Sequence, residues 1–133
     1  MLVIDAANVV GSRPTGWWRD RAGAARGFVD RVVATVAGGS LVAPVTVVVE
    51  GAARGGVPAG PAGPGVDVVH APGSGDDAIV AVATAAGGAA GTGPVRVVTA
   101  DRGLRARLTL VAVEVVGPSW LWDRLDAADS PAT

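Results

Sequence analysis

The sequence contains no cysteine and no lysine, and it has no long apolar run. Without cysteine, disulfides and thiolate-bound metals are excluded. The missing lysine accompanies heavy use of Ala, Gly, Val and Arg, as in genes rich in G and C, so we give it no functional meaning. No apolar run approaches the roughly 18–20 residues of a membrane-spanning helix, and no basic segment precedes the apolar residues near the N-terminus. We therefore expect no membrane span, no signal peptide and a cytoplasmic location.

Neither positive nor negative charge is in excess, since the formal net charge is −1 over 133 residues. Hydrophobic residues make up 50% of the chain. A chain of this length and composition predicts a single globular domain, residues 1–126, followed by a frayed tail, 127–133. Near-neutrality gives no bulk electrostatic reason to expect nucleic acid. The composition leaves homo-oligomer formation open, and function has to be sought in local motifs.

Short runs of apolar, mostly β-branched residues predict strands buried on both faces, as in a parallel sheet. These runs cover residues 2–4, 45–49, 66–69, 95–98 and 113–116. Helical patterns lie between them, at 18–36, from 75 or 76 to 88, at 102–110 and after 119. Alternating strands and helices predict an α/β fold, a three-layer α/β/α sandwich with a central parallel sheet. The Gly- and Pro-rich segment 51–65 has no periodicity and is expected to be a mobile loop inside the domain.

Acidic residues stand where predicted strands end. Asp5, Glu50 and Asp101 each close a strand, while Asp76 and Asp77 begin the helix that follows another strand. Because the carboxyl ends of parallel strands meet at one edge of a sheet, we expect these side chains to gather there. The expected group comprises Asp5, Asn8, Glu50, Asp76, Asp77 and Asp101.

Such a group of like charges repels itself unless a cation is present or the pKa values rise. An all-oxygen donor set favours Mg²⁺ or Mn²⁺ over zinc, and such ions chiefly serve phosphate chemistry. Each residue taken alone has an ordinary explanation. Asp76 or Asp77 suits a helix cap, Asp5 a turn, and Asn8 a bond to a loop backbone, while Glu50 suits a solvated loop. Their coincidence at one sheet edge favours the metal site.

Four segments, in order, resemble the NYN domain, a branch of the PIN-like nuclease superfamily. "VIDAANVV" (Val3–Val10) resembles its opening strand with Asp-x-x-Asn, and "VVVEGAAR" (Val47–Arg54) resembles its second strand. "GSGDDAIV" (Gly73–Val80) is similar to the segment that delivers the central aspartate, and "VVTADRGLR" (Val97–Arg105) to the Thr/Ser-x-Asp strand end. The resemblance implies a PIN-like fold with strand order 3-2-1-4-5. It also implies metal-dependent ribonuclease activity.

The resemblance further implies roles for single residues. Asp5, Asp101 and either Asp76 or Asp77 would be metal ligands, with Asp76 favoured of the pair. Asn8 would orient Asp5 or a bound water, and Glu50 would be a further ligand. A metal-activated water would then hydrolyse the RNA phosphodiester bond and leave a 5′-phosphate.

One departure from the family pattern concerns the residues after Asp101. Many PIN nucleases carry another acid there, whereas this chain has Arg102 and Gly103. A second metal is therefore in doubt. The alternative to a ribonuclease is a catalytically weak or inactive RNA- or protein-binding module of the same fold.

Substrate contacts are expected from arginines near the acids. Arg13, Arg102 and Arg105 are candidates for phosphate contacts. Trp17 is a candidate for stacking on a base, whereas Trp18 fits the apolar stripe of the first long helix. No Gly-x-Gly-x-x-Gly follows the first strand and no Gly-Lys-Ser/Thr occurs, so no nucleotide cofactor is expected.

Overall fold

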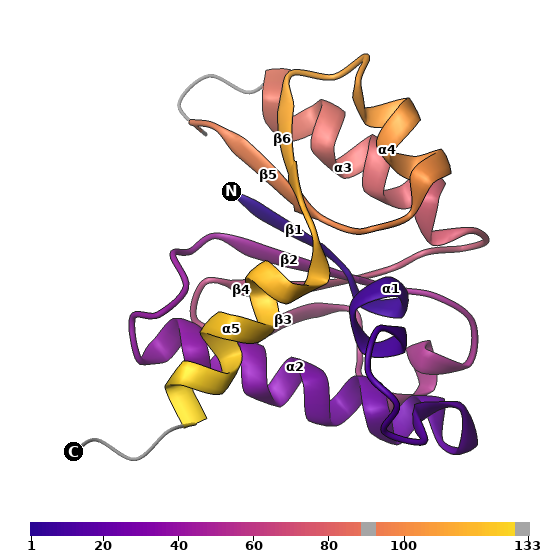
Figure 1. The fold of residues 1–133 in the computed structure, drawn as a ribbon, viewed down its shortest axis with the longest axis vertical. Helices are drawn as coiled ribbons and strands as arrows, with labels where there is room; N and C mark the ends of the chain where they lie inside the picture. Colours follow the sequence, from indigo (N-terminus) through magenta and orange to yellow (C-terminus); the bar gives the residue numbers. More distant parts are fainter. Residues whose placement is uncertain (89–92, 130–133) are drawn as a thin grey trace.

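The computed structural model describes residues 1–88 and 93–129. Strands and helices alternate along most of the chain (Figure 1). The elements are β1 (Leu2–Asp5), α1 (Ala6–Gly11), η1 (Trp17–Arg19), α2 (Arg21–Ala37), β2 (Val45–Val49), η2 (Gly51–Gly56), β3 (Gly60–Gly63), β4 (Val66–His70), α3 (Gly75–Gly88), β5 (Val95–Val98), α4 (Arg102–Leu108), β6 (Val113–Val116) and α5 (Pro118–Asp129).

The strands form one six-stranded sheet in the order β3-β4-β2-β1-β5-β6. The five predicted strands, numbered 1 to 5 along the chain, are β1, β2, β4, β5 and β6. They lie in the order β4-β2-β1-β5-β6 and all pair in parallel, which confirms the expected 3-2-1-4-5 order. The sheet is nevertheless mixed, because β3 pairs antiparallel with β4 at one edge. The five predicted strands form the expected central parallel sheet, and β3, which was not predicted, adds one antiparallel strand at its edge.

The segment 51–65 was expected to be a loop without regular structure, and the structure corrects this. It contains the 3₁₀ helix η2 and the edge strand β3. The sequence of β3, Gly-Pro-Ala-Gly, has little β-propensity and no apolar alternation, so no pattern announces it. Pro61 is tolerated because an edge strand leaves one side of its backbone without a partner strand.

Helices cover both faces of the sheet, as expected for a three-layer sandwich (Figure 1). α1, α2 and α5 pack on one face, and α3 and α4 pack on the other. All of β2 is buried, with Val47 in the core under α2 and Val48 in the core under α3. Successive strand side chains point to opposite faces, so a strand between two helical layers has to be apolar throughout.

The beginning of the first long helix differs from the prediction. The pattern predicts a helix from Trp18, with Trp18 in its buried stripe. Instead η1 ends at Arg19, and Asp20 caps α2 by accepting a hydrogen bond from the Gly23 backbone N–H at 2.9 Å. Trp18 is 53% exposed, so its placement in the core was wrong.

The C-terminal region also differs in its bounds. α4 ends at Leu108, and the next apolar residue expected in that helix, Leu110, is 91% exposed. α5 continues to Asp129, into the segment expected to be a frayed tail, and residues 130–133 of that tail lie outside the described residues. Among the described helices, we find none with the length and apolar character that crossing a membrane requires.

Candidate active site

The ends of β1 and β5 are joined by hydrogen bonds at the centre of the sheet. Asp5, the last residue of β1, is the N-cap of α1, and its Oδ1 accepts from the Asn8 backbone N–H at 3.3 Å. Its Oδ2 accepts from the Thr99 hydroxyl at 2.9 Å. The Asn8 side-chain Oδ1 accepts from the Ala100 N–H at 2.7 Å. Asp5 and Asn8 thus belong to the start of a short helix that binds the neighbouring strand end.

Thr99 links the two aspartates at this edge. It is fully buried, and its hydroxyl oxygen also accepts a hydrogen bond from the Asp101 N–H at 3.1 Å. Asp101 caps α4 by accepting from the Leu104 N–H at 2.8 Å. No role was predicted for Thr99 itself, although the Thr-x-Asp motif after β5 was the available signal.

Glu50 connects the end of β2 to the start of α3. Its Oε2 accepts a hydrogen bond from the Gly75 N–H at 2.6 Å. A Cβ at position 75 would lie 3.2 Å from this carboxylate, so glycine permits the close approach. A negative charge at a helix N-terminus is favoured because the first N–H groups of the helix have no partners within it.

The two adjacent aspartates of α3 separate. Asp77 is exposed and accepts a hydrogen bond from Arg107 of α4 at 2.8 Å. Asp76 is partly buried, and its pKa is raised by burial and by the negative charges of Asp101 and Glu50. Asp76 therefore belongs with the strand-end carboxylates, whereas Asp77 belongs to an ion pair between α3 and α4.

Asp5 carries the largest perturbation at this edge. Its pKa is raised from 3.8 to about 6, chiefly by burial and also by the charges of Asp76 and Glu50, while the hydrogen bonds from Thr99 and Asn8 lower it. Asp5, Glu50, Asp76 and Asp101 thus interact electrostatically, and we call them the carboxylate cluster.

The donor set of this cluster suits a hard cation, because it consists of oxygen atoms without cysteine or histidine. In the structure, however, these carboxylates do not form a compact metal site. Within residues 1–88 and 93–129, no three Asp, Glu or His side chains lie close enough together to hold a metal ion. Asp5, Glu50 and Asp101 each direct an oxygen toward an N–H group at a helix start.

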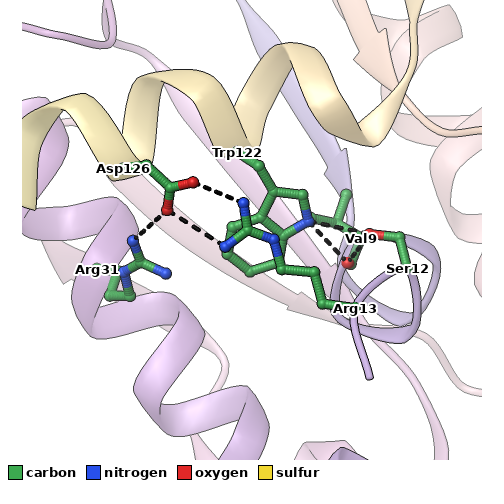
Figure 2. Close-up of polar contacts among 6 residues, drawn as sticks. All are labelled: Val9, Ser12, Arg13, Arg31, Trp122 and Asp126. Carbon is green, nitrogen blue, oxygen red and sulfur yellow. Dashed lines mark hydrogen bonds and ion pairs between the residues drawn. The ribbon is translucent and has the colours of Figure 1, made fainter. Parts of the chain in front are cut away.

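Arg13, a predicted phosphate contact, is engaged elsewhere (Figure 2). Its guanidinium donates to both oxygens of Asp126 at 2.6 and 3.3 Å and lies 4.1 Å from the ring centroid of Trp122. Arg31 of α2 donates to the same Asp126 at 3.1 Å, and both arginines lower the pKa of Asp126. Trp122 donates to the Ser12 hydroxyl at 2.9 Å. Arg13 therefore fastens the end of α1 to α5.

The other predicted phosphate contacts lie on α4, the helix that Asp101 caps. Arg102 and Arg105 are exposed, and in the part of the chain that the structure describes neither guanidinium has a partner. Arg107, by contrast, is paired with Asp77. Of the three predicted phosphate contacts, Arg102 and Arg105 are thus the two that are free to approach a bound phosphate.

A cleft of about 470 Å³ lies beside Glu50. Its walls include Trp17 and Arg21, with the Arg21 guanidinium 5.3 Å from the Trp17 ring centroid. Small apolar side chains of α1 also line it. Trp17, the predicted stacking residue, therefore lines the same cleft as Glu50, a member of the carboxylate cluster. The cleft itself was not predicted.

Known proteins were compared with the chain. No protein-family profile and no curated protein sequence matches it. Among solved structures, Rae1 (YacP) from Bacillus subtilis superimposes with a TM-score of 0.77 at 16% identity, over 97% of this chain and 75% of Rae1. A point mutant of Rae1 gives a TM-score of 0.72 at 14% identity, over 96% of this chain and 76% of that protein. At such identity the likeness shows a shared fold, and it supports the PIN-like fold expected from the motifs.

Proposed function

We propose that the protein is a metal-dependent ribonuclease that hydrolyses RNA phosphodiester bonds at the carboxylate cluster and leaves a 5′-phosphate. The observation that carries the proposal is that four carboxylates lie at one sheet edge, where burial and the charges of its neighbours raise the pKa of Asp5 to about 6. Such repulsion destabilises an ionised cluster unless a cation offsets it. The four motifs that resemble NYN domains, and the fold shared with Rae1, are consistent with this function.

Asp5, Asp76 and Asp101 would hold Mg²⁺ or Mn²⁺, with Glu50 as a further ligand. When bound, the cation lowers the pKa of a water and offsets charge on the phosphate. The chain's own groups orient the ligands: the Thr99 hydroxyl and the Asn8 N–H hold the two oxygens of Asp5. Arg102 and Arg105, at the start of α4, would position the phosphate backbone.

A second candidate is a catalytically weak or inactive RNA- or protein-binding module. Two observations favour it: within the described residues the carboxylates are not close enough to form a ready metal site, and Arg102 and Gly103 follow Asp101. Calorimetric titration with Mn²⁺ separates the candidates. The ribonuclease binds the ion, whereas the module shows no binding at millimolar concentration.

The direct test is cleavage of end-labelled RNA by the purified protein with Mn²⁺ or Mg²⁺ and with EDTA. We expect cation-dependent cleavage that falls about 100-fold or more in Asp5→Asn and Asp101→Asn, because each loses a ligand charge. Asparagine caps helices about as well as aspartate, so both variants keep the caps of α1 and α4.

Asp30→Asn is the matched control, since Asp30 is exposed on α2. It should cleave like the unchanged protein. Equal cleavage by Asp5→Asn and Asp101→Asn would refute the proposal.

A further inference from the structure

The cleft beside Glu50 combines surfaces of different chemistry. Ala6, Ala7 and Val10 of α1 contribute apolar surface, Trp17 contributes an aromatic ring, and Arg21 and Glu50 contribute charges of opposite sign. Trp17 is half-buried, and its ring edge packs 3.4 Å from where a Cβ of Gly11 would stand. The aromatic wall is therefore held in place by α1 rather than swinging in solvent.

These surfaces select among possible ligands. A bare phosphate is disfavoured because the cleft offers a carboxylate and small apolar side chains in addition to one arginine. An aliphatic group would offer no hydrogen-bonding or charged partner to Arg21 and Glu50. A flat heteroaromatic ring with a polar edge meets all of them, because its face stacks on indole and its edge carries hydrogen-bond donors and acceptors.

We propose that this cleft binds one unpaired nucleobase of the RNA, stacked on Trp17, beside the bond that is cleaved. The identity of the polymer rests on the proposed function. A base inside a duplex cannot enter such a cleft without leaving its stack, so the substrate is single-stranded at this position. Arg21, close to the Trp17 ring, would offset the charge of the phosphate attached to the bound nucleotide.

The short helix α1 couples the cleft to the carboxylate cluster. Ala6, Ala7 and Val10 line the cleft, while the Asn8 N–H and side chain bind Asp5 and Ala100 at the cluster. Glu50 borders the cleft and also belongs to the cluster. A base held in the cleft therefore determines which phosphodiester bond of the RNA lies beside the carboxylate cluster.

The test measures RNA binding without cleavage, by fluorescence anisotropy in EDTA. The probes are a short labelled single strand, the same strand annealed into a duplex, and the same strand with its bases replaced by abasic sites. The unchanged protein should prefer the single strand about tenfold or more over both other probes. Preference for the duplex, equal binding of the abasic strand, or no binding of the single strand would overturn the proposal.

Variants locate the base. Trp17→Ala should weaken single-strand binding about tenfold or more, and Trp17→Phe should restore most of it, because phenylalanine also stacks. Trp18 is not suitable as a control, because its ring packs edge-to-face on Trp17 with 6.1 Å between the ring centroids. Leu110→Ala is the control instead, since Leu110 is 91% exposed and does not line the cleft, and it should bind as before. Equal weakening by Trp17→Ala and Leu110→Ala would contradict a site in the cleft.

Ala7→Leu gives an independent variant in case Trp17→Ala unfolds. Ala7 is exposed on α1, leucine is a good helix former, and its larger side chain fills the cleft. We expect it to weaken single-strand binding about tenfold with an unchanged circular dichroism spectrum. Unaltered affinity in a folded Ala7→Leu would overturn the proposal.

The two proposals fail separately. If the protein binds the single strand through Trp17 but no cation supports cleavage, the ribonuclease is refuted and the base site is retained. If it cleaves RNA with Mn²⁺ and Trp17→Ala binds and cleaves unchanged, the base site is refuted and the ribonuclease is retained. Selective binding of a peptide, with no binding of the single strand, would refute the base site.

Discussion

At the scale of single residues, three of the four carboxylates of the cluster have a structural task besides their proposed chemical one. Asp5 and Asp101 cap α1 and α4, and Glu50 accepts from the first N–H of α3. These bonds orient the side chains before any ligand arrives. At Asp5 the hydrogen bonds favour the ionised carboxylate, whereas burial and the neighbouring negative charges disfavour it.

The raised pKa of Asp5 predicts how stability depends on pH. In the folded protein the pKa is about 6 and the ordinary value is 3.8, so folding favours the protonated acid. Stability is therefore greatest below 3.8 for this group and is lost as pH rises toward 6. Asp5→Asn, which cannot ionise, should be more stable than the unchanged protein at neutral pH by about 3 kcal/mol. The difference should shrink as the pH falls below 6.

Urea denaturation of both proteins across this pH range measures the effect. Asp30→Asn, which removes an exposed carboxylate, should show no comparable gain. A loss of stability in Asp5→Asn at neutral pH would show that its hydrogen bonds outweigh the burial of its charge.

The adjacent aspartates of α3 should behave differently. Asp76→Asn removes a charge from the cluster and should reduce cation-dependent cleavage about 100-fold or more. Asp77→Asn removes only the exposed pair with Arg107 and should keep most of the cleavage. The measurement is the single-turnover cleavage rate of each variant. The reverse ranking would show that Asp77 turns into the cluster when the cation binds.

At the scale of elements, two walls of the cleft, α1 and η2, are short and depend on neighbouring elements for their conformation. α1 has six residues, too few to be stable as an isolated helix. It is held by the Asp5 cap at its start and by Trp122, which donates to the Val9 carbonyl at 3.2 Å (Figure 2). η2 packs directly on α2, where Gly56 meets the backbone of Ala22.

Gly56 predicts how closely these elements must approach. A Cβ at position 56 would overlap the Ala22 carbonyl group, and a backbone atom cannot rotate away as a side chain can. Gly56→Ala should therefore destabilise the protein by about 1–3 kcal/mol, as overpacking does. Gly55→Ala is the matched control, since no atom lies within 4 Å of its added Cβ. Chemical denaturation measures both, and equal midpoints would contradict the close packing of η2 on α2.

At the scale of the whole molecule, sheet order brings the cluster together. β1 lies between β2 and β5, so Asp5 stands between Glu50 on one side and Thr99 and Asp101 on the other. α3 returns Asp76 to the same edge because it follows β4, the strand beyond β2. Residues as far apart in the sequence as Asp5 and Asp101 therefore share one electrostatic environment.

A cation that binds this environment should stabilise the whole fold. A ligand at 100 times its dissociation constant adds about 2.7 kcal/mol to the folded state, which raises the melting temperature by several degrees. We expect Mn²⁺ to produce this rise at neutral pH and to lose most of it in Asp101→Asn. The effect should fade below pH 6, because a protonated Asp5 cannot bind the ion. Thermal melts with and without Mn²⁺ provide the test, and an equal shift in Asp101→Asn would place the ion elsewhere.

The sequence by itself determined the parallel strands and the edge at which the acids gather. A strand covered by helices on both faces has to be apolar throughout, so runs such as Val45–Val49 identify it locally. The motif resemblance added the strand order, which the structure confirms. The strand β3 escaped prediction because edge pairing depends on a neighbour's backbone and leaves no apolar pattern.

Only the tertiary structure decided where individual side chains point. Trp18 continued the helical pattern yet lies exposed, because Asp20 begins α2 later. The sequence favoured Asp76 of the adjacent pair as a ligand, but only the structure shows that Asp76 is partly buried near the charges of Asp101 and Glu50, whereas Asp77 pairs with Arg107. Burial, charge proximity and close packing are properties of distant segments brought together, and local sequence does not encode them.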